Sequence, residues 1–269
     1  MIASRLKSLA EGFAVPLAVL VIWQLACTAG LVNPMVLPSP AAVAARWWAY
    51  LAPLEAYDPA HGSWLAWAVS GEMPHDALAS LYRVVVGFLV GAGLALLMGT
   101  SDLIYRHVNP LMQVLRPIPP IAYIPLSILW FGLGNAPAVF LIAIGAFFPV
   151  LMNTIAGVRH VDGIYIRAAR SLGASRMTIF RRVILPAATP YILSGARIGI
   201  GTAFIVVIVA EMIAVNNGLG FRILEAREYF WSDKIIAGML TIGALGLLID
   251  MGVSRLNNHL LRWHRGLES

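Results

Sequence analysis

Charged residues are scarce in this chain of 269 residues: they make up only 12% of it, whereas hydrophobic residues make up 59%. An ordinary soluble domain is about one-quarter charged. The mean hydropathy of +0.80 agrees with this imbalance. The composition therefore excludes a soluble globular protein and indicates an integral membrane protein.

Lysine is rarer still, because only Lys7 and Lys234 occur and neither follows a glycine. The phosphate-binding loop of an ATP-hydrolysing chain ends in Gly-Lys-Ser or Gly-Lys-Thr. This chain therefore does not hydrolyse ATP by that route.

Cysteine and histidine are also sparse. The single cysteine, Cys27, cannot form an internal disulfide and is expected to pack as a small hydrophobe. The histidines stand in expected loops or tails, and no two have the i, i+4 spacing of a helical zinc site; they are His61, His75, His107, His160, His259 and His264. We therefore expect no metal site and no bis-histidine haem site.

Long apolar runs dominate what is present. Six of them approach the roughly 20 residues that a helix needs to cross a bilayer: 12–30, 81–100, 117–133, 136–157, 191–214 and 235–253. They are continuous and rich in Leu, Ala and Met, which favours helices over the alternating strands of a barrel. We expect an all-α membrane protein of about six transmembrane helices. Because five runs follow the first, that run is expected to be a retained anchor and not a cleaved signal peptide.

Positive charge is distributed unevenly between the two sets of loops. One set holds Arg5, Lys7, Arg106, Arg116, Arg159, Arg167, Arg170, Arg176, Arg181, Arg182, Arg255, Arg262 and Arg265, and the other holds Arg46, Arg83, Arg222, Arg227 and Lys234. Cytoplasmic loops carry the excess of Lys and Arg, so we expect both termini in the cytoplasm. The net charge of +6 is explained by these flanks, and no nucleic-acid partner is expected.

Three regions follow from this pattern. Residues 1–80 would hold the first transmembrane helix and an acidic, proline-rich external loop, in which Ala41 to Leu54, with Trp47 and Trp48, favours a short helix at the outer interface. Residues 81–253 would form the transmembrane core, including a cytoplasmic loop at 158–190. Residues 254–269 would form a cytoplasmic tail.

The third run opens with Arg116-Pro-Ile-Pro-Pro-Ile-Ala-Tyr-Ile-Pro125. Irregular backbone at membrane depth is tolerated only where protein or a water-filled path covers it. Two interpretations stay open: the segment lines a pathway, with Pro119, Pro120 and Tyr123 as candidates, or it only kinks the start of a helix.

Small residues recur at four-residue spacing in Gly87-x-x-x-Gly91 and Gly195-x-x-x-Gly199. This spacing lets helix backbones approach closely, within one subunit or between two. We expect packing within the subunit, because the spacing is common in glycine-rich membrane helices.

The loop at 158–190 has an organised polar sequence. Asp162 can cap a helix on which Ile164, Ala168 and Leu172 share one narrow apolar face, with Arg167 and Arg170 on the opposite side. Gly173 permits a sharp turn, Ser175 can cap a second short helix, and Pro186 and Pro190 are expected to end it. The first helix could dock in a groove of another protein, with small Ala168 and Ala169 allowing close approach and Leu172 as an anchor, or it could rest on anionic lipid.

This loop resembles the cytoplasmic coupling signature of ABC importer permeases: Glu-Ala-Ala, three residues, Gly, nine residues, Ile, any residue, Leu-Pro. Ala168, Ala169, Gly173, Leu185 and Pro186 match it, while Arg167 replaces the Glu and Val183 the Ile. The resemblance implies that an ATPase subunit is contacted by Arg167, Ala168, Ala169, Leu172, Gly173, Ala174, Ser175, Leu185 and Pro186.

The likeness runs from about Arg116 to Gly266. It includes Trp130-Phe-Gly-Leu-Gly134, Arg197-Ile-Gly-Ile-Gly201, Ala210-Glu-Met-Ile-Ala214, Gly218-Leu-Gly220 and Arg262-Trp-His-Arg-Gly266. These segments are similar to the nitrate, sulfonate, taurine and bicarbonate importer permeases.

The family likeness implies a type I importer in the inner membrane. Its parts would be a homodimer of this permease, two cytoplasmic ABC ATPase subunits that hold ATP and Mg, and an external substrate-binding protein. This chain would be a transport subunit without catalytic residues or a cofactor of its own. The cargo would be a small anion, and the chain alone does not say which one.

Charged residues inside the expected spans are Arg197, Glu211 and Asp250. Each costs at least about 2.5 kcal/mol near the bilayer centre, so each marks a possible functional position. Arg197 would snorkel or pair with a neighbouring helix, Asp250 would be interfacial near Arg255, and Glu211 would be paired, cap the backbone of Asn216 and Asn217, or line an outer gate. Uncharged polar candidates for the path are Asn153, Thr154 and Thr202, although an interhelical hydrogen bond is their more common role.

Two other functions remain alternatives. A secondary carrier or channel without ATPases would use the arginine-rich loop to bind lipid, but the inverted hydropathy repeats typical of such carriers are not evident. A membrane-bound enzyme subunit would need an acid–base or cofactor-ligand set, which the sequence does not offer.

Overall fold

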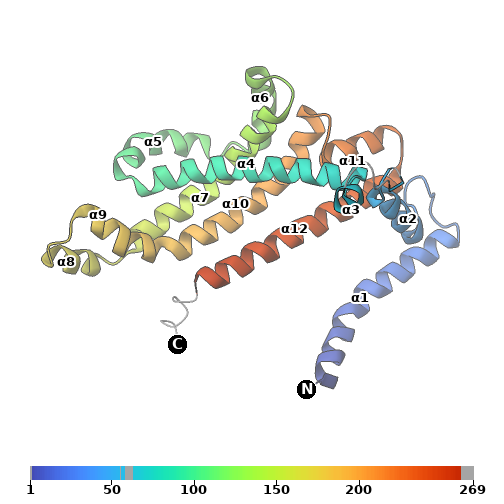
Figure 1. Cartoon of the computed structure of the whole chain (residues 1–269), viewed down its shortest axis with the longest axis horizontal. Coiled ribbons are helices and arrows are strands. Elements are labelled where there is room, and N and C mark those ends of the chain that lie inside the picture. The colour runs from blue at the N-terminus through green and yellow to red at the C-terminus, as the bar shows by residue number, and fades with distance from the viewer. Residues whose placement is uncertain (1, 55, 58–62, 262–269) are drawn as a thin grey trace. The chain divides into compact units, whose positions relative to one another are not determined.

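The computed structural model describes residues 2–54, 56–57 and 63–261 (Figure 1). Every regular element among them is a helix. Glu55 and Asp58 of the acidic loop, His61, and the tail residues 262–269 with His264 lie outside the described residues. The all-α fold expected from the apolar runs is confirmed for the described part of the chain.

The chain divides into two compact units: Met1–Asp76 with Arg222–Ile242, and Ala77–Phe221 with Gly243–Ser269. The first holds α1 (Ile2–Thr28), α2 (Pro40–Leu51) and α3 (Trp64–Ala68). The second holds α5 (Asp102–Leu115), η1 (Pro120–Tyr123), α6 (Ile124–Phe131), α7 (Asn135–His160), α8 (Gly163–Ser171), α9 (Arg176–Ile179), η2 (Phe180–Ile184) and α10 (Leu185–Ala214). Three helices contribute residues to both units: α4 (Glu72–Thr100), α11 (Leu219–Glu228) and α12 (Ser232–Leu260).

Four helical stretches among the described residues are long and apolar enough to cross a membrane: α4, α7, Arg176–Ala214 and α12. The pair Leu103–Leu115 and Pro120–Phe131 adds a fifth if it counts as one span, and Ala14–Thr28 of α1 is a shorter apolar helix. The expected number of about six is reached only if both of these are counted.

The run at 117–133 is not the single span that the sequence predicts. Within it, the short helix η1 is followed by the eight-residue α6, and this stretch, Pro120–Phe131, is bent by 90° from the preceding helical segment Leu103–Leu115. Proline removes a backbone donor and clashes with the preceding turn, so Pro117, Pro119, Pro120 and Pro125 prevent a straight helix. The segment 102–115, for which the sequence predicts a loop, is the helix α5, capped by Ser101.

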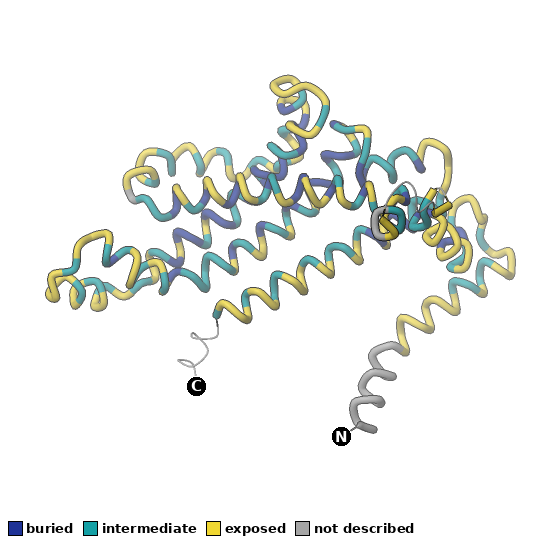
Figure 2. Tube along the Cα trace, viewed as in Figure 1, coloured by how far each residue is buried: buried dark blue, intermediate teal, exposed yellow. Residues whose placement is uncertain are grey.

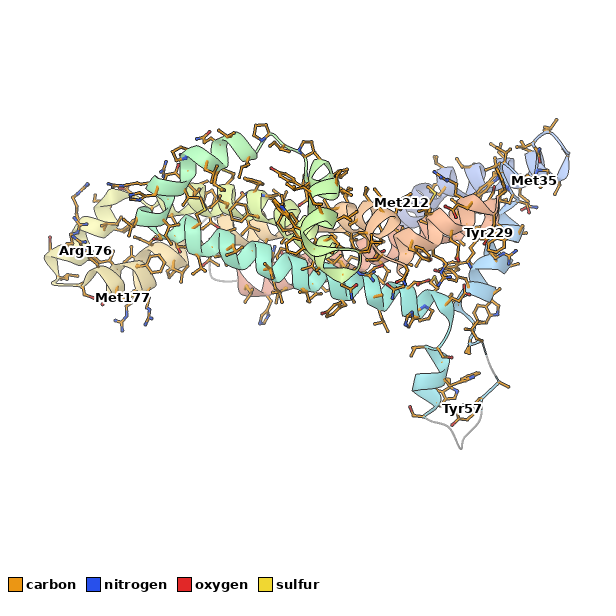
Figure 3. The ribbon with its side chains drawn as sticks, turned by 90° about the horizontal axis from the view of Figure 1, so that it is seen from above. Met35, Tyr57, Arg176, Met177, Met212 and Tyr229 are labelled. Atoms are coloured by element: carbon orange, nitrogen blue, oxygen red, sulfur yellow. The ribbon has the colours of Figure 1, made fainter. Side chains whose placement is uncertain are left out.

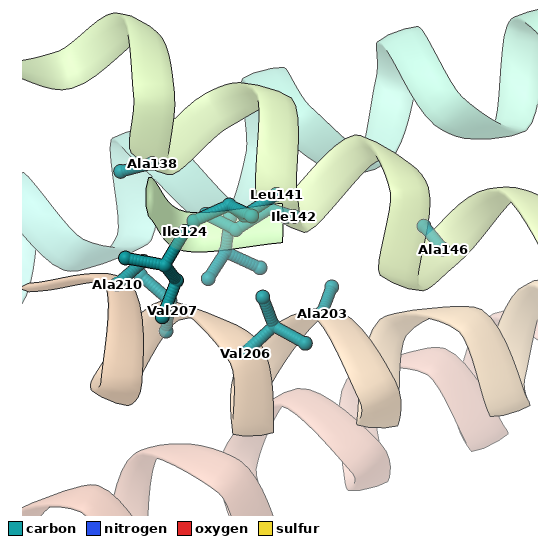
Figure 4. Close-up of a cluster of buried hydrophobic side chains, with 10 residues drawn as sticks. Ile124, Ala138, Leu141, Ile142, Ala146, Ala203, Val206, Val207 and Ala210 are labelled. Carbon is teal, nitrogen blue, oxygen red and sulfur yellow. The ribbon is translucent and has the colours of Figure 1, made fainter. Parts of the chain in front are cut away.

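The core of the second unit lies along α7. Figure 4 shows Ala138, Leu141, Ile142 and Ala146 of α7 near a row of small apolar side chains from α10, with Ile124 of α6 beside them. Val84 of α4 belongs to the same cluster. The α10 row is Ala203, Val206, Val207 and Ala210. Small residues on both helices let the two backbones approach, and dispersion contacts then replace contacts with lipid.

Both glycine pairs pack within the chain, as predicted. A Cβ on Gly87 of α4 would meet Ile142 of α7, and a Cβ on Gly91 would meet Ala143 of α7. A Cβ on Gly195 of α10 would meet Asn153 of α7. Gly199 of α10 likewise faces Val150 and Ala146 of α7. Helix α7 is therefore held between α4 and α10 by backbone-level contacts.

The first unit contains the short helix that the sequence predicts over 41–54, as α2; its place at a membrane interface stays a prediction. Ser39 caps it by accepting a hydrogen bond from the N–H of Ala42 at 3.2 Å. Trp47 donates its indole N–H to Thr241 at 2.9 Å, whereas Trp48 is exposed.

Two acids of the segment predicted to be the external loop, Glu72 and Asp76, are paired with cations from later in the chain. Arg222 donates to the buried Asp76 at 2.8 Å, and Lys234 donates to Glu72 at 2.9 Å. The hydroxyl of Tyr50 also donates to Asp76 at 2.8 Å. Burial, the charge of Asp76 and this hydrogen bond all raise the pKa of Tyr50, so the hydroxyl stays protonated. The sequence showed few cations near these acids because the partners lie more than a hundred residues away.

Candidate functional site

The loop predicted to couple to an ATPase forms two helices joined by a tight turn. Asp162 caps α8 by accepting a hydrogen bond from the N–H of Ile164 at 2.9 Å, as the sequence predicts. Ser175 caps α9 by accepting one from the N–H of Thr178 at 3.2 Å. We call the segment from Asp162 to Ile179 the α8–α9 module.

The turn between the two helices depends on Gly173, whose φ is +76°. The N–H of Gly173 donates to Arg170 at 2.9 Å, and that of Ala174 donates to Ala169 at 3.1 Å. This pair of bonds is a Schellman motif, in which a left-handed residue satisfies the last carbonyls of a helix. A Cβ at Gly173 would meet no atom within 4 Å, so the backbone angle and not crowding is what requires glycine there.

The second helix does not end at the prolines, contrary to the sequence prediction. Arg176–Ala214 is one helical stretch of 39 residues, with Pro186 in its path and Pro190 inside α10. The π-helical turn η2 makes this possible: the N–H of Leu185 donates to Phe180, five residues back. The shifted register accommodates Pro186, which has no N–H for an ordinary helical bond.

The module is exposed over most of its surface, as Figure 2 shows, and α8 has no buried residue. Leu172 is 88% exposed, and Ile164 and Met177 are also exposed. Figure 3 labels Arg176 and Met177 at the tip of the module. Ala168 is exposed and Ala169 half-buried, while Ile179 is buried and fixes α9 to the unit. Contact with an ATPase through this face stays a prediction.

A buried ion pair lies at the other end of α10. Arg83 of α4 donates to Glu211 at 2.6 Å, and their side chains are 2% and 0% exposed. Ser80 donates to Glu211 at 2.8 Å, and the N–H of Gly220 donates to it at 2.9 Å. Glu211 is therefore paired, which was one of the alternatives left open.

The rest of this cluster holds Arg83. Asn135 at the start of α7 accepts a hydrogen bond from Arg83 at 2.7 Å, and Asn217 accepts with both its side chain and its carbonyl. We call Ser80, Arg83, Asn135, Glu211 and Asn217 the Arg83–Glu211 cluster. The sequence analysis placed Arg83 in an outer loop and did not identify it as the partner of Glu211. The signal that could have found the pair was one Arg and one Glu, each near the end of its span on the same side of the membrane.

The remaining path candidates are dispersed. Pro119 is exposed, Pro120 and Tyr123 are half-buried, and Asn153 donates to the carbonyl of Pro149 in its own helix at 2.9 Å. Their place in a pathway stays a prediction.

The two threonine candidates differ in their hydrogen bonding. Thr202 of α10 lies within 3.0 Å of the carbonyl oxygen of Gly145 in α7, an interhelical partner for its hydroxyl. Thr154 is fully buried, and its hydroxyl has no hydrogen-bond partner among the described residues. Thr154 therefore neither lines an open surface of this chain nor makes the expected interhelical bond.

Substituting the two threonines by valine is expected to give effects of opposite sign. Thr154→Val removes an unsatisfied buried hydroxyl and should stabilise the protein by about 1 kcal/mol. Thr202→Val removes an interhelical bond and should destabilise it by about 0.6 kcal/mol. SDS titration of the purified protein measures both; a Thr154→Val variant less stable than the parent contradicts the assignment.

Arg197 and Asp250 form an ion pair between α10 and α12. Two parallel bonds of 2.8 Å join them, from Nε to Oδ1 and from Nη2 to Oδ2. Arg197 therefore pairs with a neighbouring helix, which was one of its two expected roles, and the partner of Asp250 is Arg197. Asp250 lies on the face of α12 that is directed at α10. The sequence does not reveal which face of α12 meets α10.

Comparison with known proteins agrees with this fold. The sequence pattern of the family described as "Binding-protein-dependent transport system inner membrane component" matches residues 84–265. The taurine transport system permease protein TauC of Escherichia coli (strain K12) is 37% identical over 245 residues, which cover 91% of this chain and 86% of TauC. The nitrate import permease protein NrtB of Leptolyngbya laminosa is 38% identical over 176 residues, 64% of this chain and 63% of NrtB.

A solved structure shares the fold. An inward-facing MetNI methionine ABC transporter superposes with a TM-score of 0.60 at 20% identity, covering 70% of this chain and 96% of that one. The matched residues include the whole α8–α9 module, the Arg197–Asp250 pair and the cluster residues Asn135, Glu211 and Asn217, whereas Ser80 and Arg83 precede the match. The chain belongs to the inner membrane components of binding-protein-dependent transport systems, the permeases of ABC transporters.

Proposed function

We propose that this chain is the membrane-spanning subunit of an ATP-driven importer for small oxyanions such as sulfonates or nitrate. Two copies would associate with two cytoplasmic ATPase subunits, which hold ATP and Mg, and would receive the solute from an external binding protein. Both termini and the α8–α9 module would lie in the cytoplasm. The cargo class rests on the names of the relatives, taurine and nitrate transporters.

The observation that supports coupling most directly is the construction of the α8–α9 module. Its two helices are fixed by Asp162 and Ser175, yet its apolar residues Ile164 and Leu172 are exposed. Exposed apolar side chains on a rigid, capped helix are typical of a docking surface. A lipid-binding helix would not need a turn that holds a second helix beside it.

The helix Arg176–Ala214 supplies a path for movement. At 39 residues it is about 58 Å long, nearly twice the roughly 30 Å of a hydrocarbon core. A displacement of the module would therefore be carried along one continuous helix to the positions of Arg197 and Glu211. The π-helical turn η2 is the place where this helix can bend.

Leu172→Ser tests the docking surface. Burying a leucine against a partner contributes at least about 1.5 kcal/mol, so the ATPase subunit should bind about tenfold more weakly. Leu133→Ser is the matched control, because Leu133 is 75% exposed but lies between α6 and α7, outside the module. Co-purification of a tagged permease with a co-expressed ABC ATPase subunit measures the binding.

Two results would contradict the proposal. If the unaltered chain captures no ATPase subunit, it acts as a carrier or channel. If Leu172→Ser and Leu133→Ser weaken capture equally, the module is not the docking surface. In a reconstituted complex, ATPase activity stimulated by a taurine- or nitrate-loaded binding protein would identify the cargo.

A further inference from the structure

The Arg197–Asp250 pair has an unusual setting for an ion pair. Both residues lie in helices long and apolar enough to span the membrane, yet their side chains are 49% and 51% exposed on this chain. Charges that face lipid are expensive at membrane depth and almost always face a protein interior or water. The face that carries this pair is therefore not a plain lipid-facing surface.

A cavity of about 190 Å³ adjoins the pair. Its other lining residues are apolar or glycine: Ile200, Gly201, Phe204, Gly246, Ile249 and Val253. A Cβ added to Gly201 would meet no atom within 4 Å, so the space beside that residue is open. The volume is below the roughly 300–1,000 Å³ of sites for drug-sized ligands, which limits an occupant to a small solute.

Arg197 and Asp250 are the charged residues that line this cavity. A guanidinium has five N–H donors, and the bonds to Asp250 use two of them. The planar fork matches two oxygens of an oxyanion as well as it matches a carboxylate. The carboxylate of Asp250 thus occupies the position that a sulfonate or nitrate would take.

We propose that Arg197 binds the transported oxyanion and that Asp250 is its internal competitor. With no solute present, the carboxylate of Asp250 binds the guanidinium of Arg197 and keeps the site neutral. An arriving oxyanion displaces this carboxylate. When the carboxylate binds Arg197 again, it favours release of the oxyanion. A transport site must bind strongly enough to admit a solute and weakly enough to let it leave, and this exchange meets both needs. The inference rests on the proposed function, since it names the solute site of the same importer.

Single substitutions of the pair provide the test, because the proposal predicts opposite effects. Asp250→Asn removes the competitor, so the purified permease–ATPase complex should bind ethanesulfonate or nitrate about tenfold more tightly, whereas Arg197→Gln should bind them at least about tenfold more weakly. Both probes lack a cationic group that Asp250 could attract. Equilibrium dialysis measures binding in the absence of the binding protein.

A purely structural pair predicts something else. Both single variants would then lose anion binding and stability together. The double variant, Arg197→Gln with Asp250→Asn, has no charge at either position and would recover both anion binding and stability. Under the proposal, the double variant stays unable to bind anions although it folds, as size-exclusion and thermal unfolding would show. Recovery of binding in the double variant, or no tightening in Asp250→Asn for either probe, overturns the inference.

The cavity supplies an independent arm of the test. Gly201→Val fills open space beside Arg197 and should weaken binding of ethanesulfonate, the larger probe. Gly243→Val is the matched control, since Gly243 is also helical, meets no atom within 4 Å and does not line the cavity. Equal effects of the two variants would count against the site. Stimulation of the unaltered complex by a loaded binding protein tests the importer function separately, so the two ideas can fail independently.

Discussion

Glu211→Ala is expected to destabilise the folded permease by about 3–5 kcal/mol, because it leaves a buried guanidinium without its counter-ion. Arg83 is 2% exposed and cannot reach water without moving α4. The substitution also removes the acceptor for Ser80 and for the N–H of Gly220. SDS-titrated unfolding of the detergent-solubilised chain measures the loss.

The geometry explains why so much depends on one carboxylate. The cluster joins α4, the start of α7, the end of α10 and the turn that leads into α11. Gly218 in that turn has a φ of +106°, and a Cβ there would lie within 3.0 Å of Glu211 and Arg83. The ion pair and the turn are therefore packed against each other.

Controls separate burial from charge. Arg46→Ala breaks an ion pair to Asp233 in which the arginine is 46% exposed, and such a loss is about 1 kcal/mol or less. Glu211→Gln keeps the shape and part of the hydrogen bonding, so it should fall between the two. If the Glu211→Ala variant is as stable as Arg46→Ala, the buried Arg83–Glu211 cluster does not stabilise the fold more than an exposed ion pair does.

Gly91→Ala is the second substitution with a large expected effect. Its Cβ would lie less than 3.0 Å from the carbonyl oxygen of Ala143, and a backbone atom cannot rotate away as a side chain can. Helices α4 and α7 would have to separate, at a cost of about 1–3 kcal/mol from overpacking. The loss should appear as a lower unfolding midpoint in SDS.

Gly93→Ala is the matched control, two residues further along the same helix. A Cβ there meets no atom within 4 Å, so only the helix propensity changes, and alanine is favoured over glycine by about 1 kcal/mol. The two substitutions are thus expected to shift stability in opposite directions. If Gly91→Ala is neutral or stabilising, the close approach of α4 and α7 is wrong.

Local features of the site could be predicted from the sequence. Asp162, Gly173 and Ser175 act as cap, turn and cap, because each role depends on the residue itself and on partners within a few positions. The helices and the glycine contacts were predictable for the same reason, since the apolar runs and the four-residue glycine spacing are each visible within one short segment of the sequence.

The prolines mark where local rules failed. Pro186 and Pro190 are helix breakers by propensity, yet Arg176–Ala214 is continuous because a π-helical turn absorbs the missing hydrogen bond. A register shift of this kind depends on the surroundings of the helix in the folded chain, which propensity does not include. Between α5 and α6, by contrast, prolines do interrupt the helix, and the two helical segments meet at 90°.

The sequence by itself determined the membrane class, the lack of a Gly-Lys-Ser or Gly-Lys-Thr phosphate-binding loop and the local structure of the α8–α9 module, because composition, motif and short-range hydrogen bonding decide them. Only the tertiary structure decided which charges meet: Arg83 with Glu211 and Arg197 with Asp250 are 128 and 53 positions apart. Opposite charges in spans require partners, but many pairings satisfy that requirement. Helix packing selects one of them, since a guanidinium and a carboxylate interact strongly only when two helices bring them within hydrogen-bonding distance.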